Sequence, residues 1–176
     1  MRRTGQRGFT LIEIMVTVAI IAVLAYLVVP QFMSQSRKSK AGSEIGYMFG
    51  ELGVREDQYK LEKGSYLAAT CPTSVPAPTG VAITTLQTAG GCYAPLTSAW
   101  AQLRVRVGEA KLYCQYTVTT GTGTGTSAPA GFTWASPSTA WYYILATCDT
   151  DGVASTNSQY FIASSDSTIQ KLNEGR

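Results

Sequence analysis

The sequence predicts an α+β fold in which a long N-terminal helix is followed by a C-terminal antiparallel sheet of about four strands. Three observations support this prediction. Residues Ile14–Val29 are apolar except for Thr17, apolar residues then recur at helical spacing to about Glu62, and short strand-like runs bounded by turn residues fill the second half. The 176 residues suffice for one domain with an appended element.

The apolar segment predicts a membrane-spanning helix. Counted from Phe9 to Val29, it is long enough to cross a bilayer core of roughly 30 Å at about 1.5 Å per residue. The residues before it, 1–8, include three arginines. Basic residues beside a span stay on the cytoplasmic side, so we expect the rest of the chain to face the opposite side.

Beyond these arginines the chain is formally neutral. Three of the 14 basic residues lie there, so the remaining basic residues equal the 11 acidic residues in number. A neutral body lacks the electrostatic footprint of a nucleic-acid-binding protein. The chain also has no histidine, which removes the commonest general base and zinc ligand. We therefore expect neither a nucleic-acid partner nor an enzyme.

The apolar segment differs from an ordinary export signal in its cleavage signal. Such signals end in a small-x-small site after the apolar core, whereas the core here ends in AYLVVPQF, which contains no such site. A small residue, Gly8, precedes the core instead. Cleavage after Gly8 would leave the apolar helix as the N-terminus of the mature protein, with a new α-amino group on Phe9.

Glu13 lies inside the apolar segment, where an ionised carboxylate costs at least a few kcal/mol. A partner for this charge is therefore expected. A neighbouring copy of the helix, shifted along its axis, could place its Phe9 amine against Glu13, and the pair would then set the register between subunits. The simpler alternative is a glutamate near the membrane interface that reaches water.

The sequence RGFTLIE at Arg7–Glu13, the apolar run behind it and Pro30 resemble the N-terminus of type IV pilins and the related type II secretion pseudopilins. The resemblance implies that prepilin peptidase cuts between Gly8 and Phe9 and methylates the Phe9 amine. It also implies that Glu13 serves assembly. At Pro30 the helix should bend or loosen, because proline removes one backbone hydrogen bond.

The resemblance implies the type IV pilin fold and a division of the chain into four parts. These are a cytoplasmic leader that is removed (1–8), a transmembrane and assembly half of the helix (9–30), an amphipathic half (31–62) and a periplasmic or extracellular sheet (63–176). The implied function is that of a structural subunit of a type IV pilus. Such a subunit is held in the lipid of the bacterial inner membrane before assembly. The assembly machinery there then adds it to a homo-oligomeric helical filament outside the cell.

Two alternatives to the pilus subunit share the same N-terminus. One is a type II secretion pseudopilin, and the other is a low-abundance minor pilin. The sequence does not distinguish motility, adhesion, DNA uptake and secretion as the role of the filament.

The second half of the helix shows two stripes. An apolar stripe should pack against the rest of the chain, and consists of Ile45, Met48, Phe49, Leu52 and Tyr59. The neighbouring stripe consists of Gly42, Gly46, Gly50 and Gly53. Each glycine costs up to about 1 kcal/mol in a helix, so the second stripe indicates either a close approach by the sheet or a neighbouring subunit, or a locally weak helix.

Residues 63–176 predict the sheet and its loops. Residues 70–91 are rich in proline, threonine and glycine and predict a long loop, and Gly121–Gly131 predicts a flexible exposed one. The first two strands should form a hairpin, and the third should be central. The expected strands are Leu103–Val107, Lys111–Val118, Trp141–Thr147 and Gln159–Ala163, with Thr168–Leu172 as a candidate for the last one.

Four cysteines lie behind the export-like segment and indicate two disulfides in an oxidising compartment. Three connectivities are possible. We favour pairing between sequence neighbours, Cys71 with Cys92 and Cys114 with Cys148. The alternative is a set of four free thiols in a cytosolic protein.

Two further features carry weaker functional hypotheses. Asp149, Asp151 and Asn157 surround Gly152 in CDTDGVASTN and resemble the start of a calcium loop, as in the C-terminal loop of some pseudopilins, but no glutamate stands at the twelfth position. A simple Asp–Gly turn is the favoured explanation, and we expect no other cofactor. The second feature is a basic cluster with nearby tyrosines on the expected hairpin, formed by Arg104, Arg106, Lys111, Tyr113 and Tyr116. We favour a solvated sheet face over nucleic-acid binding as its explanation.

Overall fold

The computed structural model of the chain describes residues 9–94 and 98–174. The chain divides into two compact units, Met1–Ser36 and Arg37–Arg176. Helix α1, Leu11–Lys63, contributes residues to both units and continues through Pro30. The proline therefore does not end the helix, and the bend expected there stays a prediction.

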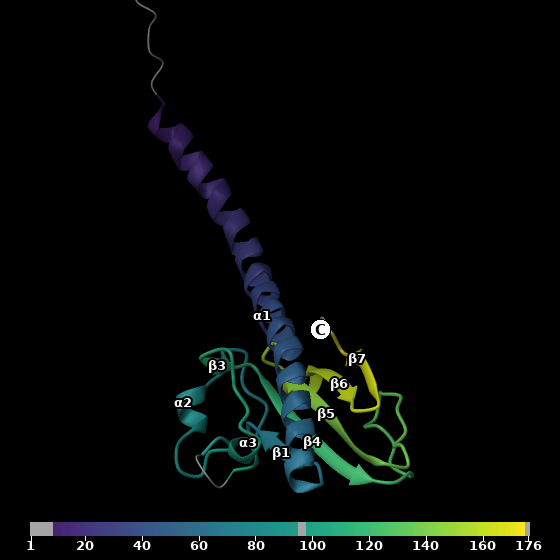
Figure 1. Cartoon of the computed structure of the whole chain (residues 1–176). Coiled ribbons are helices and arrows are strands. Elements are labelled where there is room, and N and C mark those ends of the chain that lie inside the picture. Colours follow the sequence, from purple (N-terminus) through teal and green to yellow (C-terminus); the bar gives the residue numbers. More distant parts are fainter. Residues whose placement is uncertain (1–8, 95–97, 175–176) are drawn as a thin grey trace, which may run out of the picture. The chain divides into compact units, whose positions relative to one another are not determined.

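The second unit combines the later part of α1 with an antiparallel sheet of five strands (Figure 1). In spatial order the strands are β1 (Ala69–Cys71), β4 (Cys114–Thr122), β5 (Ala140–Cys148), β6 (Ser158–Ala163) and β7 (Asp166–Leu172). The α+β class is confirmed, and β5 is the central strand as expected.

Shorter elements complete the second unit. β2 (Val81–Ala82) pairs with β3 (Lys111–Leu112), while α2 (Ile83–Leu86), α3 (Ala99–Gln102) and the 3₁₀ turn η1 (Ala154–Thr156) lie in the connections. In Figure 1, α2 and β3 lie on one side of α1, and β6 and β7 lie on the other.

The core forms where the apolar stripe of α1 meets one face of the sheet. Ile45, Met48, Phe49 and Leu52 are buried, and Tyr59 packs partly buried against the same cluster. Side chains alternate between the two faces of a strand, and alternate residues from the first part of β4 and from most of β5 join this core. The sheet residues concerned are Cys114, Tyr116, Val118, Tyr142, Ile144, Ala146 and Cys148.

The expected strand Leu103–Val107 is wrong, and so is its hairpin with the following run. Leu103 follows α3, and its backbone N–H still donates to the carbonyl of Ala99 (2.9 Å). Arg104 has a φ of 55°, in the left-handed region, which reverses the chain. Alternating hydrophobicity here reflects burial of Leu103 and Val105 beside α3, without a partner strand.

The two expected loops are more ordered than their composition suggests. The segment 70–91 begins within β1, whose Cys71 pairs with Tyr116 of β4, and it also contains β2 and α2. Beyond β4, Thr126 and Ser136 exchange hydrogen bonds of 3.0 Å, and Ser127 forms an isolated bridge with Ala135.

The segment after β4 brings aromatic rings onto the sheet face opposite α1. Trp134 lies 5.1 Å from Trp141 and 5.6 Å from Tyr143 between ring centroids, and Phe132 stacks on Phe161 at 5.3 Å. These rings follow directly after Gly121–Gly131, whose residues are exposed or intermediate in burial, in keeping with the exposed loop expected there.

Candidate assembly site

The start of α1 carries a reciprocal capping arrangement. The Thr10 hydroxyl accepts from the backbone N–H of Glu13 (3.3 Å), and Glu13 Oε2 accepts from the backbone N–H of Thr10 (3.4 Å). This is the capping box, in which two N–H groups at a helix start find acceptors. The pattern Thr-x-x-Glu at the start of a helix indicates this capping role of Glu13, which was not expected from the sequence beside its role in assembly.

The surroundings of Glu13 are apolar and exposed. Phe9 and Leu11 are each 78 % exposed, and every described residue from Phe9 to Val29 belongs to the exposed class. By length and composition, α1 is apolar enough to cross a membrane. Gly8 lies outside the described residues, so the cleavage site is represented here by Phe9 alone.

A glutamate missed in the sequence joins α1 to the sheet. Glu44 is 6 % exposed and accepts hydrogen bonds from the backbone N–H groups of Tyr113 (2.7 Å) and Cys114 (3.2 Å) and from the Tyr116 hydroxyl (2.8 Å). Burial raises the pKa of Glu44, and the three donors oppose this rise. Glu44 stands four residues before Met48, on the apolar stripe of the helix. This position was the sequence signal that could have identified Glu44 as a buried residue.

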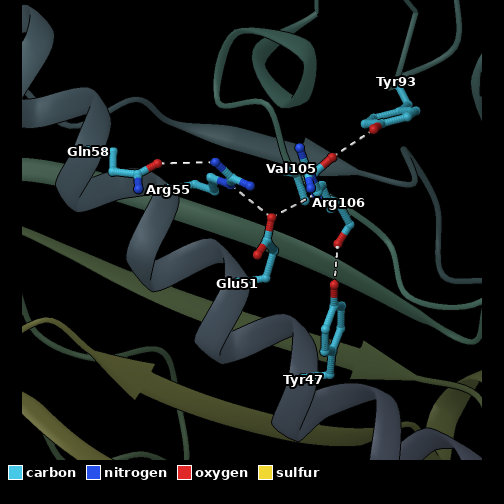
Figure 2. Close-up of polar contacts among 7 residues, drawn as sticks. All are labelled: Tyr47, Glu51, Arg55, Gln58, Tyr93, Val105 and Arg106. Carbon is cyan, nitrogen blue, oxygen red and sulfur yellow. Dashed lines mark hydrogen bonds and ion pairs between the residues drawn. The ribbon is translucent and has the colours of Figure 1, made fainter.

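A second polar network fastens α1 to the segment after α3 (Figure 2). Glu51 Oε1 accepts from Arg55 Nε (2.8 Å) and from the backbone N–H of Arg106 (2.9 Å). The Tyr47 hydroxyl donates to the Arg106 carbonyl (3.2 Å), and the Tyr93 hydroxyl donates to the Val105 carbonyl (2.7 Å). These contacts satisfy backbone groups that a strand partner would otherwise have used.

The glycine stripe divides into two parts. A Cβ atom placed on Gly53 would lie 3.1 Å from the Tyr142 hydroxyl, so the sheet approaches α1 closely at this position. A Cβ placed on Gly42, Gly46 or Gly50 would meet no atom within 4 Å. The sheet therefore explains Gly53 and does not explain the other three.

The cysteines form the two disulfides favoured from the sequence. Cys71 is bonded to Cys92, and Cys114 is bonded to Cys148. The second pair joins opposed residues of β4 and β5. The first joins β1 to the connection after α2. One disulfide therefore links two neighbouring strands, and the other links an edge strand to a loop.

The geometry of the calcium candidate is that of an ordinary turn. Asp149 and Asp151 accept hydrogen bonds from the backbone N–H groups of Gly152 (2.6 Å) and Val153 (2.8 Å), as in a turn. Within residues 9–94 and 98–174, no group of three or more acidic, cysteine or histidine side chains could hold a metal ion. The side-chain oxygen of Asn157 is buried and has no hydrogen-bond partner among these residues.

The basic cluster loses its proposed sheet surface. The hairpin that would have presented Arg104 and Arg106 is absent, and Tyr116 is buried against Glu44. Tyr116 is therefore unavailable for stacking on a nucleic-acid base.

Comparison with known proteins gives partial matches. Residues 3–27 match the family described as prokaryotic N-terminal methylation motif. The chain is 45 % identical over 69 residues to type II secretion system core protein G of Klebsiella michiganensis and 49 % identical over 70 residues to that of Escherichia coli, in each case 38 % of this chain and 46 % of the relative. It is 48 % identical over 46 residues to type IV major fimbrial protein FimA of Dichelobacter nodosus, 24 % of this chain and 30 % of the relative. The chain thus spans less than half the length of these relatives, and no solved structure matches it.

An apolar helix long enough to cross a membrane, a carboxylate at its start and an antiparallel sheet behind it define the pilin-like class. The fold is thus pilin-like, and residues 3–27 carry the prokaryotic N-terminal methylation motif.

Proposed function

We propose that the chain is a structural subunit of a type IV pilus. In this proposal, prepilin peptidase removes residues 1–8 and methylates Phe9, and residues 9–30 hold the subunit in the bacterial inner membrane. The assembly machinery then adds it to a homo-oligomeric filament outside the cell. The observation that carries the proposal is the exposed apolar start of α1 with Glu13 inside it. The proposal includes no catalytic role and no required cofactor.

The exposed side chains need an apolar environment before and after assembly. Each large apolar side chain that stays away from water contributes about 1–3 kcal/mol. Lipid tails supply this environment in the membrane, and neighbouring helices supply it in a filament. Because the two environments are similarly apolar, packing and polar pairing must decide the arrangement of the helices.

Glu13 supplies a polar pairing of this kind. Among the described residues, the Glu13 Oε2 atom accepts hydrogen bonds from the backbone N–H and the hydroxyl of Thr10. The amine of Phe9 on a neighbouring subunit would neutralise the carboxylate in a low-dielectric setting, where an unpaired charge is disfavoured. Such a pair fixes the axial step between subunits, which apolar contacts alone define poorly.

Two substitutions separate the charge of Glu13 from its capping role. Glu13→Gln keeps an acceptor suited to the capping box and removes the charge, so we expect membrane insertion to continue and filament yield to fall at least tenfold. Thr10→Ala removes the cap and keeps the carboxylate, so it should leave most of the yield. Yields are measured by immunoblotting of sheared filaments against the membrane fraction. Normal yield from Glu13→Gln would refute the pairing.

A type II secretion pseudopilin is the second candidate. It is supported by the relatives named type II secretion system core protein G. Under this alternative, processed protein would stay with the cell envelope, and deletion of the gene would stop protein secretion while leaving surface filaments unchanged.

A further inference from the structure

A second buried glutamate of α1 lies near the end of the helix. Glu56 is 0 % exposed. Its Oε2 atom accepts a hydrogen bond from the backbone N–H of Leu67 (2.9 Å), two residues before β1 begins. Its Oε1 atom is buried and has no hydrogen-bond partner among the described residues. Glu56 thus connects α1 to the chain reversal that follows it.

The contrast with Glu44 shows how poorly this carboxylate is satisfied. Glu44 receives three hydrogen bonds across its two oxygens. Glu56 receives one and leaves the other oxygen unpaired. An ionised carboxylate buried with a single donor is far more unfavourable than a neutral carboxyl in the same place.

We propose that Glu56 is a pH-sensitive clamp on the reversal between α1 and β1, which holds Leu67 while the carboxyl is neutral and loosens the reversal when the carboxyl ionises.

The groups around the clamp do not compensate its charge. Asp57 follows it on α1, and its negative charge further disfavours ionisation of Glu56. The Lys60 ammonium donates to the Tyr66 hydroxyl (3.2 Å), and this hydroxyl donates to Asp57 Oδ1 (3.4 Å). From the sheet, Tyr142 packs edge-on against Tyr66, with ring centroids 4.8 Å apart. The nearby lysine is thus engaged by Tyr66, and no other cation is recorded against Glu56 in the described part of the chain.

The direction of the pH effect follows from proton linkage. Burial raises the pKa of Glu56 from 4.5 to about 7, against the opposing hydrogen bond from Leu67. Between these pH values the folded chain binds more protons than the unfolded chain, so stability falls as pH rises. The loss approaches tenfold in the folding equilibrium constant per pH unit, and opening the reversal alone relieves the buried charge at less cost than global unfolding.

The first test measures denaturant unfolding of the full chain in detergent micelles from pH 5 to pH 8, with disulfides intact. We expect Glu56→Gln to remove about one proton's worth of pH dependence between pH 5 and 7. Glu62→Gln, which changes an exposed glutamate of the same helix, is the matched control and should retain that dependence. Glu44 contributes equally in all three proteins. A pH dependence in Glu56→Gln equal to that of the unmodified chain would overturn the proposal.

The second test requires no substitution. Hydrogen exchange at the Leu67 amide, corrected for the intrinsic effect of pH, should lose at least tenfold in protection between pH 5.5 and 7.5 in the unmodified chain. Core amides of β5 exchange through global unfolding, so a local opening predicts that the Leu67 amide keeps less protection than these amides throughout the range. Unchanged protection at Leu67 would contradict the clamp. Both tests use the unassembled chain, so their outcome is independent of filament formation.

Discussion

At the scale of single residues, Glu44 determines how α1 meets the start of β4. Its carboxylate accepts the N–H groups of Tyr113 and Cys114, at the point where the chain passes from β3 into β4. Tyr113 lies between the two strands, and Cys114 is the first residue of β4. One side chain on the helix therefore provides the acceptors for two successive backbone N–H groups at the start of β4.

Removing this carboxylate should weaken the folded state strongly. Glu44→Ala leaves two buried N–H groups and the Tyr116 hydroxyl without their acceptor, and we expect about 3 kcal/mol or more to be lost from the free energy of unfolding. The measurement is denaturant unfolding of the full chain in detergent. Glu109→Ala, an exposed carboxylate near Glu44, is the control and should change stability by less than about 0.5 kcal/mol. Equal effects of the two substitutions would refute the assigned role.

The sequence predicted residues whose role depends on local order and missed those whose role depends on tertiary contacts. Phe9 and Glu13 stand in a recognisable motif, and the cysteines pair between sequence neighbours. Glu44 and Glu56 bind backbone groups 69 and 11 residues away, respectively, and no local pattern identifies such partners. Their presence on the apolar face of α1 was the one sign that they needed buried donors.

At the scale of elements, α1 presents an uncovered glycine face in the second unit. A side chain at Gly42, Gly46 or Gly50 would meet open space. Two explanations from the sequence therefore remain: close packing by a neighbouring subunit, or a helix that is locally weak.

Two substitutions at Gly46 distinguish these explanations. Gly46→Ala should stabilise the unassembled chain by about 0.5–1 kcal/mol, because it improves helix propensity without a clash. Gly46→Leu also fits the free chain, but we expect it to block filament formation if a neighbouring backbone packs there. Thermal unfolding in detergent measures the first effect, and sheared filament yield measures the second. Normal filaments from Gly46→Leu would favour the weak helix.

Strand prediction failed where side chains of α1 and of the connection before α3 replaced strand partners. Leu103–Val107 alternates apolar and basic residues, yet its backbone is bound by Glu51, Tyr47 and Tyr93. β1 has only three residues and precedes Pro72, so it is too short to produce a pattern. The central strands β5 and β6 were predictable because their apolar runs are long and continuous.

At the scale of the whole molecule, the N-terminal motif and the sheet carry different kinds of information. The motif at residues 3–27 defines the class and the expected processing. The matches to these relatives cover 38 % of the chain or less, so most of the sequence lies outside them. The motif therefore bears on the proposed assembly, and it carries no information about the sheet of the second unit.

The most direct test of filament assembly is mass spectrometry of the N-terminal peptide, comparing sheared surface filaments with the membrane fraction. The proposed function predicts a peptide that begins at N-methylated Phe9 and is abundant in the sheared material. The same peptide confined to membranes would contradict the surface pilus and favour the pseudopilin. An intact N-terminus at Met1, or cleavage after the apolar segment, would contradict the assignment of residues 9–30 as an assembly helix.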